Sequence, residues 1–223
     1  MSSKHVYFVR HGESVANATG IRQGAETPLT ELGRRQALCV GKRLSGMRIK
    51  RIVKSPFVRA RETSELIEQE LPGVPVTESA LFVERRNPSV MVGTMAGDPE
   101  MEHAWRLIAE NYHVSGWHHS DEENFDDLVG RAKEVLTLLE GLLEKNILVV
   151  SHGMFMKVLF ARVLLGDNLN GRIFWDQFVP AKNVANTGMM HLEYAENFQK
   201  TGKYWRLVSW NDHAHLKELP KLA

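Results

Sequence analysis

Apolar positions along the chain follow two periods, and these predict alternating strands and helices. Short runs rich in β-branched residues predict buried strands, whereas apolar positions that recur every three to four residues predict helices. Strands are predicted at residues 5–10, 52–53, 147–150, 189–194 and 204–210, with a polar turn containing Gly202 between the last two. Their alternation with helices predicts an α/β fold with a mainly parallel central sheet and helices on both faces.

Several helical segments carry their own start signals. Thr30 precedes a helix whose apolar stripe reaches Leu44, and Asp98-Pro99 begins a helix that runs to Tyr112. Ser55-Pro56 gives a further signal, in which the serine is predicted to cap a helix and the proline to occupy its first position. Two more helices are predicted, one at residues 125–142 and one after the strand end at 152 that continues to 165.

Composition is that of an ordinary globular protein. The 223 residues include 28 Lys or Arg and 27 Asp or Glu, so the formal net charge is +1. Such a balance gives no broad basic field, so no nucleic-acid partner is expected. No strong boundary or linker divides the chain, so residues 1–223 are predicted to form a single domain.

The cysteine count and the hydropathy of the chain exclude several classes of protein. The single cysteine, Cys39, excludes an intrachain disulfide and any paired-cysteine metal or redox site. No apolar run approaches the ~18 residues of a membrane span, and the N-terminus lacks room for a signal peptide. We therefore expect a soluble cytoplasmic protein without a membrane partner. The oligomeric state is not readable from the sequence.

Polar side chains follow three predicted strands. Two strands end in Arg10-His11-Gly12 and Ser151-His152-Gly153, and a third is followed by Ser55 with Arg59 one helical turn further on. In parallel sheets the ligand lies beyond the carboxyl ends of the strands. Imidazole and guanidinium groups beside glycine suit a phosphoryl site, because arginine binds phosphate oxygens in a bidentate manner.

Each of these residues has a plainer interpretation when it is taken alone. A single histidine is more often a hydrogen-bonded structural residue, and Arg59 beside Arg61 would otherwise be a solvated helix charge. The combination favours the phosphoryl site, because two histidines and an arginine all follow strands of one α/β pattern.

Longer motifs extend this pattern. They are residues 9–14 (Val-Arg-His-Gly-Glu-Ser) with Asn17, residues 55–63 (Ser-Pro-Phe-Val-Arg-Ala-Arg-Glu-Thr), residues 150–153 (Val-Ser-His-Gly), and Gln23-Gly24 followed by Pro28-Leu29-Thr30 and Gly33. In this order the set resembles the histidine phosphatase superfamily, also called the phosphoglycerate mutase-like family. The resemblance covers most of the chain and is weakest at residues 87–121.

The resemblance implies a mechanism. His11 would be the nucleophile that becomes a transient phosphohistidine. Arg10, Arg59 and His152 would surround the phosphoryl group and stabilise its charge in the transition state. No metal and no cofactor are expected, since arginine and histidine supply the positive charge.

A carboxylic acid is also needed to protonate the leaving alkoxide. Glu84 stands where the family places its acid, after the third strand, and Glu13 in the first motif is the competing carboxylate. The plainer interpretation of Glu84 is a surface carboxylate paired with a neighbouring arginine. Four further residues are predicted to contact the substrate: Asn17, Gln23, Gly24 and Gly153.

The family contains both phosphatases and mutases. Gln23-Gly24, the Arg-Arg-Asn-Pro run at residues 85–88, and Met154 after Ser-His-Gly all depart from the mutase versions and favour hydrolysis. The predicted function is therefore hydrolysis of phosphomonoesters. Two alternatives stay open: phosphoglycerate mutase-type transfer, and a catalytically idle binding or regulatory member.

Residues 85–123 are predicted to form a cap or lid over the pocket. Arg85 and Arg86 are candidates for a second anionic group of the substrate, although at least one is expected to be solvated. Trp105 and Trp117 fit packing roles. The pairs His118-His119 and His213 with His215 lack a third ligand at a recognised spacing, so no metal site is assigned. The expected substrate is a small-molecule phosphomonoester, with a phosphoprotein as the open alternative.

Overall fold

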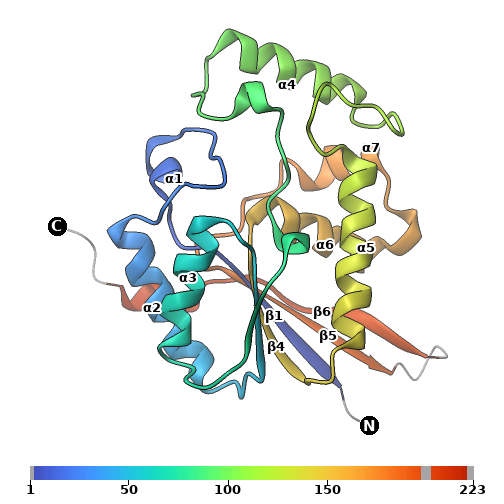
Figure 1. Ribbon diagram of the computed structural model, residues 1–223. Helices are drawn as coiled ribbons and strands as arrows, with labels where there is room; N and C mark the ends of the chain where they lie inside the picture. The colour runs from blue at the N-terminus through green and yellow to red at the C-terminus, as the bar shows by residue number, and fades with distance from the viewer. Residues whose placement is uncertain (1–2, 197–201, 220–223) are drawn as a thin grey trace.

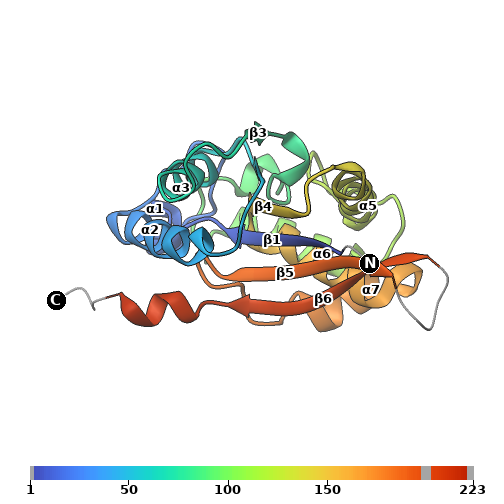
Figure 2. The same ribbon diagram turned by 90° about the horizontal axis from the view of Figure 1, so that it is seen from below.

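The computed structural model describes residues 3–196 and 202–219. Six strands form one sheet in the order β3-β2-β4-β1-β5-β6. β1, β2, β3 and β4 run parallel, while β5 runs antiparallel to both of its neighbours. Figure 2 shows β5 and β6 continuing the sheet beyond β1 to its outer edge. The strands are β1 Lys4–Arg10, β2 Arg51–Lys54, β3 Val76–Glu78, β4 Asn146–Ser151, β5 Met189–Glu196 and β6 Lys203–Asp212.

Helices cover both faces of the sheet, so the predicted mainly parallel α/β fold is confirmed. α2 and α3 lie together on one side and α5 and α6 on the other (Figure 1). The α-helices are α1 Val15–Thr19, α2 Glu31–Ser45, α3 Val58–Glu68, α4 Pro99–Asn111, α5 Phe125–Gly141, α6 Gly153–Leu165 and α7 Gly171–Ile173. Short 3₁₀ turns lie at Ala80–Phe82, Ser89–Met91, Gly166–Asn168 and Ala214–Glu218, and a π-helical turn lies at Phe174–Phe178.

The core divides into two clusters because successive side chains of each strand point to opposite faces. Val6 and Phe8 of β1 pack with the α5 and α6 side, whereas Val9 packs with the α2 and α3 side. β4 is buried at every position from Ile147 to Ser151. Its continuous apolar run is typical of a central parallel strand, and it places the histidine that follows at the middle of the sheet edge.

Local sequence explains most helix starts. Thr30 Oγ1 accepts a hydrogen bond from Gly33 N at 3.0 Å, and Asp98 Oδ1 accepts one from Met101 N at 2.9 Å. These two predicted caps are confirmed. The part of the polar turn between β5 and β6 at residues 197–201 lies outside the described residues.

The predicted cap at Ser55 is wrong. α3 begins three residues later at Val58, and Phe57 is its N-cap without a side-chain hydrogen bond. The physical reason is that Ser55 Oγ has other partners: it accepts from Phe57 N at 3.3 Å and bonds His152 Nε2 at 2.8 Å. The serine therefore connects two strand ends instead of closing a helix.

The segment between β3 and α5 crosses the sheet edge where the parallel strands end. It carries α4, which lies above that edge in Figure 1. That residues 85–123 work as a lid stays a prediction. Among the described residues no helix is long and apolar enough to cross a membrane.

Candidate active site

The end of β1 presents His11 as a buried, neutral imidazole. Its Nδ1–H donates to the Gly12 carbonyl at 2.7 Å, and its Nε2 accepts a hydrogen bond from Arg59 Nε at 3.2 Å. The side chain is 1% exposed. Burial, and then the charges of Arg10 and Arg59, hold the pKa of His11 well below its usual value. Nε2 therefore carries a lone pair at neutral pH.

A second buried histidine follows β4. The His152 ring centroid lies 5.2 Å from that of His11, and its Nε2 is held by Ser55 Oγ. The edge of the ring packs against Phe57, also at 5.2 Å. Burial, followed by the charge of Arg59, lowers the pKa of His152 well below its usual value. Its Nδ1 is buried and has no hydrogen-bond partner within the described structure.

Two guanidinium groups flank the histidines. Arg59 is 1% exposed and donates from Nη1 to the Gly24 carbonyl at 2.7 Å. Arg10 donates from Nη1 to the Val184 carbonyl at 2.5 Å, while its Nε is buried without a hydrogen-bond partner among the described residues. Burial lowers the pKa of Arg59 to about 10, so the group stays cationic at neutral pH.

Residues preceding β5 support the same strand end from the other side. Thr187 N donates to the carbonyls of Arg10 and His11 at 3.1 and 3.3 Å, with its own φ at 55°. Asn186 Nδ2 donates to His11 O at 3.3 Å and to Asn17 Oδ1 at 3.1 Å. A positive φ is uncommon for a threonine, and here it is held by the hydrogen bond of Thr187 Oγ1 with buried His215 at 2.9 Å.

A close backbone contact fixes the loop after His11. A Cβ atom on Gly33 would lie 2.0 Å from the Glu13 carbonyl oxygen, and one on Gly12 would lie 2.4 Å from the Gly33 oxygen. Only glycine permits this approach of α2 to the loop. Gly12 N also donates to Thr63 Oγ1 at 3.0 Å, which ties the loop to α3.

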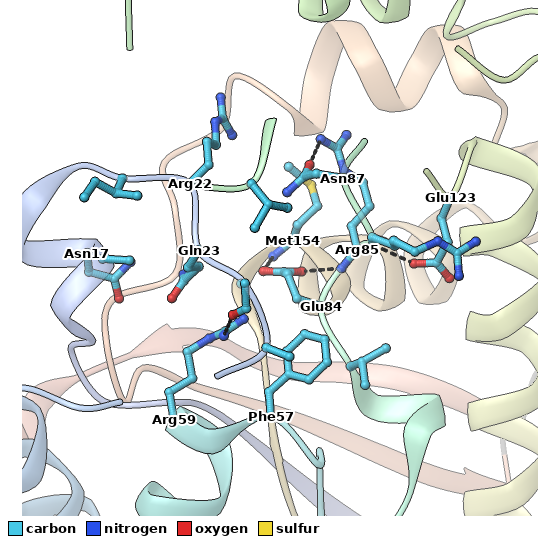
Figure 3. Close-up of a pocket in the computed structure, with 18 of the residues that line it drawn as sticks. Asn17, Arg22, Gln23, Phe57, Arg59, Glu84, Arg85, Asn87, Glu123 and Met154 are labelled. Atoms are coloured by element: carbon cyan, nitrogen blue, oxygen red, sulfur yellow. Dashed lines mark hydrogen bonds between the residues drawn. The ribbon is translucent and has the colours of Figure 1, made fainter. Parts of the chain in front are cut away.

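Glu84 lies in the pocket next to the start of α6. Its Oε1 accepts from Arg85 N and Phe155 N, both at 2.9 Å, and its Oε2 accepts from Met154 N at 3.1 Å. These bonds hold the carboxyl group at the helix N-terminus (Figure 3). Glu13 instead accepts from Thr30 Oγ1 at 2.8 Å and is not part of the pocket lining. The structure thus brings only the first of the two candidate acids to the pocket.

The four residues predicted to contact the substrate all line this pocket. They also form contacts that hold the surrounding structure. Asn17 and Gln23 organise the loop: Asn17 Oδ1 accepts from Ser14 N at 3.3 Å, and Gln23 Oε1 accepts from Ser14 Oγ at 2.8 Å. Gly24 offers its carbonyl to Arg59. At Gly153 a Cβ atom would lie 3.4 Å from Arg10 Nε, so the absence of a side chain leaves room beside that nitrogen.

The pocket itself has a volume of about 880 Å³. Arg10 and Arg59 form part of its wall, whereas His11 and His152 lie beneath that wall, with 1% and 0% of their surface exposed. A cavity of this size accommodates a small organic molecule and not only a phosphoryl group.

Sequence reasoning missed several residues around the pocket. Arg22 and Arg131 line it, and Asn186 and Thr187 hold the nucleophile strand end from outside it. Arg22 stands beside the recognised Gln23, so its position carried a signal. The strand β5 carried another, because an antiparallel strand begins at the edge where its parallel neighbours end. Arg131 gave none, since it lies within the helix predicted at residues 125–142, away from every motif.

The candidate metal pairs have other partners or lack a third ligand. His118 Nε2 bonds Asp127 Oδ2 at 2.9 Å, and His215 bonds Thr187. In the parts of the chain that the structure describes, no group of three or more His, Cys, Asp or Glu side chains is arranged to hold a metal ion.

Comparisons with known proteins identify the family of the chain. A family model for the histidine phosphatase superfamily (branch 1) matches residues 6–213. The adenosylcobalamin/alpha-ribazole phosphatase of Escherichia coli is 31% identical over 173 residues, which cover 71% of this chain and 78% of that protein. A Yersinia pestis protein named probable phosphoglycerate mutase GpmB is 30% identical over 223 residues, covering 97% of this chain and 96% of that protein.

Solved structures share the fold. A mutant phosphoserine phosphatase of Entamoeba histolytica, in complex with phosphoserine, has a TM-score of 0.74 at 22% identity, covering 97% of this chain and 100% of its own. The mycobacterial glucosyl-3-phosphoglycerate phosphatase in complex with VO3 also has a TM-score of 0.74 at 22% identity, covering 93% and 99% of the two chains. At such identities the likeness concerns the architecture.

Proposed function

The chain belongs to the histidine phosphatase superfamily, and from that premise we propose that it hydrolyses phosphomonoesters through a phosphohistidine formed on His11. One observation carries the proposal. The neutral His11 ring keeps a lone pair on Nε2, and around it Arg10 Nε and His152 Nδ1 are buried without hydrogen-bond partners among the described residues. A phosphoryl group placed there would satisfy both nitrogens and meet the nucleophile.

In the first step His11 Nε2 attacks phosphorus, so that a P–N bond forms while the ester P–O bond breaks. The proposed acid Glu84 gives its proton to the leaving alkoxide. In the second step water attacks the phosphohistidine, the same carboxylate takes the water proton, and inorganic phosphate leaves with His11 restored.

Arg59 has a double task in this scheme. Its Nε–H covers the lone pair of His11 at 3.2 Å before substrate binds. A phosphoryl oxygen is a stronger acceptor than imidazole, because it carries charge. Substrate would therefore draw the guanidinium to itself and free His11 for attack. His152 supports the same group, with Ser55 O–H donating to Nε2 and Nδ1–H donating to the phosphoryl oxygen.

The proposed reaction needs no metal ion. Phosphoryl transfer depends on charge stabilisation at the equatorial oxygens. Arg10 and Arg59 supply two fixed cations beside the nucleophile, and the start of α6 at Gly153 adds its dipole. We therefore expect the phosphatase activity to persist when a metal chelator is added.

Hydrolysis is preferred over mutase-type transfer, and a small-molecule phosphate ester over a phosphoprotein. Relatives carry names of both phosphatases and a phosphoglycerate mutase, so their names alone do not decide. Gln23, the Arg-Arg-Asn-Pro run and Met154 favour hydrolysis, and all of these residues except the proline line the pocket. Interconversion of 2- and 3-phosphoglycerate without release of phosphate would contradict hydrolysis and indicate mutase-type transfer.

The decisive experiment compares the wild-type protein with His11→Ala, using p-nitrophenyl phosphate with and without chelator. We expect turnover that persists with chelator, an acid-labile phosphoenzyme, and loss of both activity and phosphoenzyme in the variant. His118→Ala is the matched control, since His118 is exposed and pairs with Asp127 outside the pocket. An inactive wild type, or an active His11→Ala protein, contradicts the proposal. Catalysis without any phosphoenzyme would exclude the covalent route.

A further inference from the structure

Two guanidinium groups of the pocket lie over one tryptophan, away from the buried histidines. The Cζ atoms of Arg22 and Arg85 are each 5.3 Å from the ring centroid of Trp105. The three residues come from distant parts of the chain: the loop before Gln23, the segment after Glu84, and α4. Both arginines line the pocket. We call this group the arginine–tryptophan cluster.

In the described part of the chain, neither arginine forms an ion pair with a carboxylate. Within the described residues no ion pair joins Arg22 or Arg85 to an acidic side chain, and Arg85 Nη2 donates to the neutral amide of Asn87 at 2.5 Å. Arg131, on the same pocket wall, shows the usual alternative, since it pairs with Glu123 at 2.8 Å. Within the described residues, Arg22 and Arg85 therefore lack the carboxylate partner that Arg131 has.

Keeping the positive charges of Arg22 and Arg85 close together lowers the stability of the folded protein. Arg85 is only 7% exposed. Burial lowers the pKa of Arg22, and the charge of Arg85 lowers it further. Two like charges that are partly withdrawn from water destabilise the protein unless a counter-charge arrives. The counter-charge that fits an open pocket is an anionic group of a ligand.

We infer that Arg22 and Arg85 bind a second anionic group, a carboxylate or a second phosphate, of the substrate whose reacting phosphoryl group lies at Arg10 and Arg59. This inference rests on the proposed function, and it names the substrate class as small phosphomonoesters with an anionic tail. Figure 3 shows Arg22 and the Arg85–Asn87 pair at the end of the pocket opposite Arg59. The volume of about 880 Å³ leaves room for a tail between the two ends.

The test uses substrate pairs that differ in the tail alone. 3-Phosphoglycerate and glycerol 3-phosphate differ by a carboxylate in place of a hydroxymethyl group. Fructose 1,6-bisphosphate and fructose 6-phosphate differ by one phosphate. The measured quantity is the ratio of kcat/KM within each pair, which distinguishes a carboxylate tail from a phosphate tail. We expect the wild-type protein to prefer the anionic member of at least one pair by about tenfold or more.

Variants at Arg22 then locate the preference. Arg22→Gln should lower the preferred ratio about tenfold, and Arg22→Lys should restore part of it, because a lysine keeps the charge without the planar fork. Arg106→Gln is the matched control: this exposed arginine follows Trp105 on α4 and does not line the pocket, so the ratio should stay unchanged. A wild-type ratio near one in both pairs, or an unchanged ratio in Arg22→Gln, overturns the inference.

A binding measurement separates this inference from the proposed function. Calorimetric dissociation constants of the same compounds with His11→Ala do not depend on turnover. Tighter binding of the anionic members to His11→Ala, weakened about tenfold by adding Arg22→Gln, supports the cluster even if no ester is hydrolysed. Equal binding of both members overturns it, even if hydrolysis is confirmed.

Discussion

The two ends of the pocket are built in different ways. The inner end, formed by Arg10, His11, Arg59 and His152, begins at strand ends and at the first turn of α3, and its histidines are buried in hydrogen bonds to backbone and side chains. The outer end is the arginine–tryptophan cluster, which is assembled from a loop, an irregular segment and α4. The geometry of the sheet fixes the inner end, whereas the outer end depends on contacts between a loop, an irregular segment and α4.

This difference predicts two kinds of mutational effect. Substitutions at the inner end should lower the rate with every substrate, because all substrates present the same phosphoryl group there. Substitutions at the outer end should change the choice among substrates and leave the chemical step nearly intact. The following predictions test that division from the largest expected effect to the smallest.

Arg59→Met should lower kcat by about 100- to 1,000-fold with every phosphomonoester, because it removes a cation that faces the transition state. Arg59→Lys should recover only part of the loss, since it cannot place both Nε and Nη1 as in the native fork. Steady-state kinetics of Arg61→Met, an exposed neighbour on α3, gives the control. An Arg59→Met protein with a tenth of wild-type kcat would remove Arg59 from the inner end.

Glu84→Gln should show a dependence on the leaving group. Alkyl phosphates need a proton on the departing oxygen, so their kcat should fall about 100-fold or more, whereas p-nitrophenyl phosphate should lose less than about tenfold. A purely structural role at the N-terminus of α6 would lower both rates equally. Thermal unfolding of the variant shows how much of any common loss comes from the hydrogen bonds to Met154 and Phe155.

Gly33→Ala should destabilise the protein by about 1–3 kcal/mol, because its Cβ would meet the Glu13 carbonyl oxygen at 2.0 Å. Gly130→Ala, in α5 with open space around its Cβ position, should instead stabilise it by about 0.5–1 kcal/mol. Chemical denaturation measures both changes. Equal stability of the two variants would mean that α2 and the nucleophile loop can separate without cost.

Acid should destabilise the folded protein through the inner histidines. The pKa values of His11 and His152 are lowered by burial, so the unfolded chain takes up protons first as the pH falls below about 6.5. As the pH falls from 7.5 to 5.5, each histidine should lower the free energy of unfolding by about 1 kcal/mol. His11→Asn should flatten the pH dependence by one such contribution. An unchanged slope in denaturation experiments would show that His11 takes up its proton equally in the folded and unfolded states, and would contradict its lowered pKa.

Trp105→Leu should give the smallest change with p-nitrophenyl phosphate, less than about threefold in kcat/KM, because this substrate lacks a second anion. The ring supports Arg22 and Arg85 and is not placed beside the phosphoryl group. With a substrate that carries an anionic tail the same variant should raise KM and leave kcat nearly unchanged. A large fall in kcat with p-nitrophenyl phosphate would break the division between the two ends.

The inner end was largely predictable from the sequence, because strand order brings strand ends together. His11, Arg59 and His152 each follow a parallel strand, and the structure gathers all three. The boundary of α3 was not predictable, since Ser55 bonds a histidine nearly a hundred positions away. Prediction of an N-cap uses only neighbouring residues, so it does not include a competing partner that is distant in the sequence.

The outer end was predicted only in part. Arg85 and Arg86 are both candidates for a second anion from the sequence, and both line the pocket. Only Arg85 lies over Trp105, whereas Arg86 Nε donates to the Asp121 carbonyl at 2.7 Å. Arg22, Arg85 and Trp105 come from three separate segments, and no periodicity relates them. Trp105 was expected to pack, and it does so against Trp175 as well as beneath the two arginines.

The supports of the nucleophile have a consequence for synthesis of the chain. His11 precedes Asn186 by 175 positions in the chain, yet the carbonyl of His11 is held by Asn186 and Thr187, the carbonyl of Arg10 is held by Thr187, and Thr187 in turn is held by His215. At roughly 5–20 residues per second, these supports leave the ribosome about ten seconds or more after the nucleophile. A nascent chain that contains the first motif therefore lacks the hydrogen bonds that support His11 until the residues up to His215 have been made.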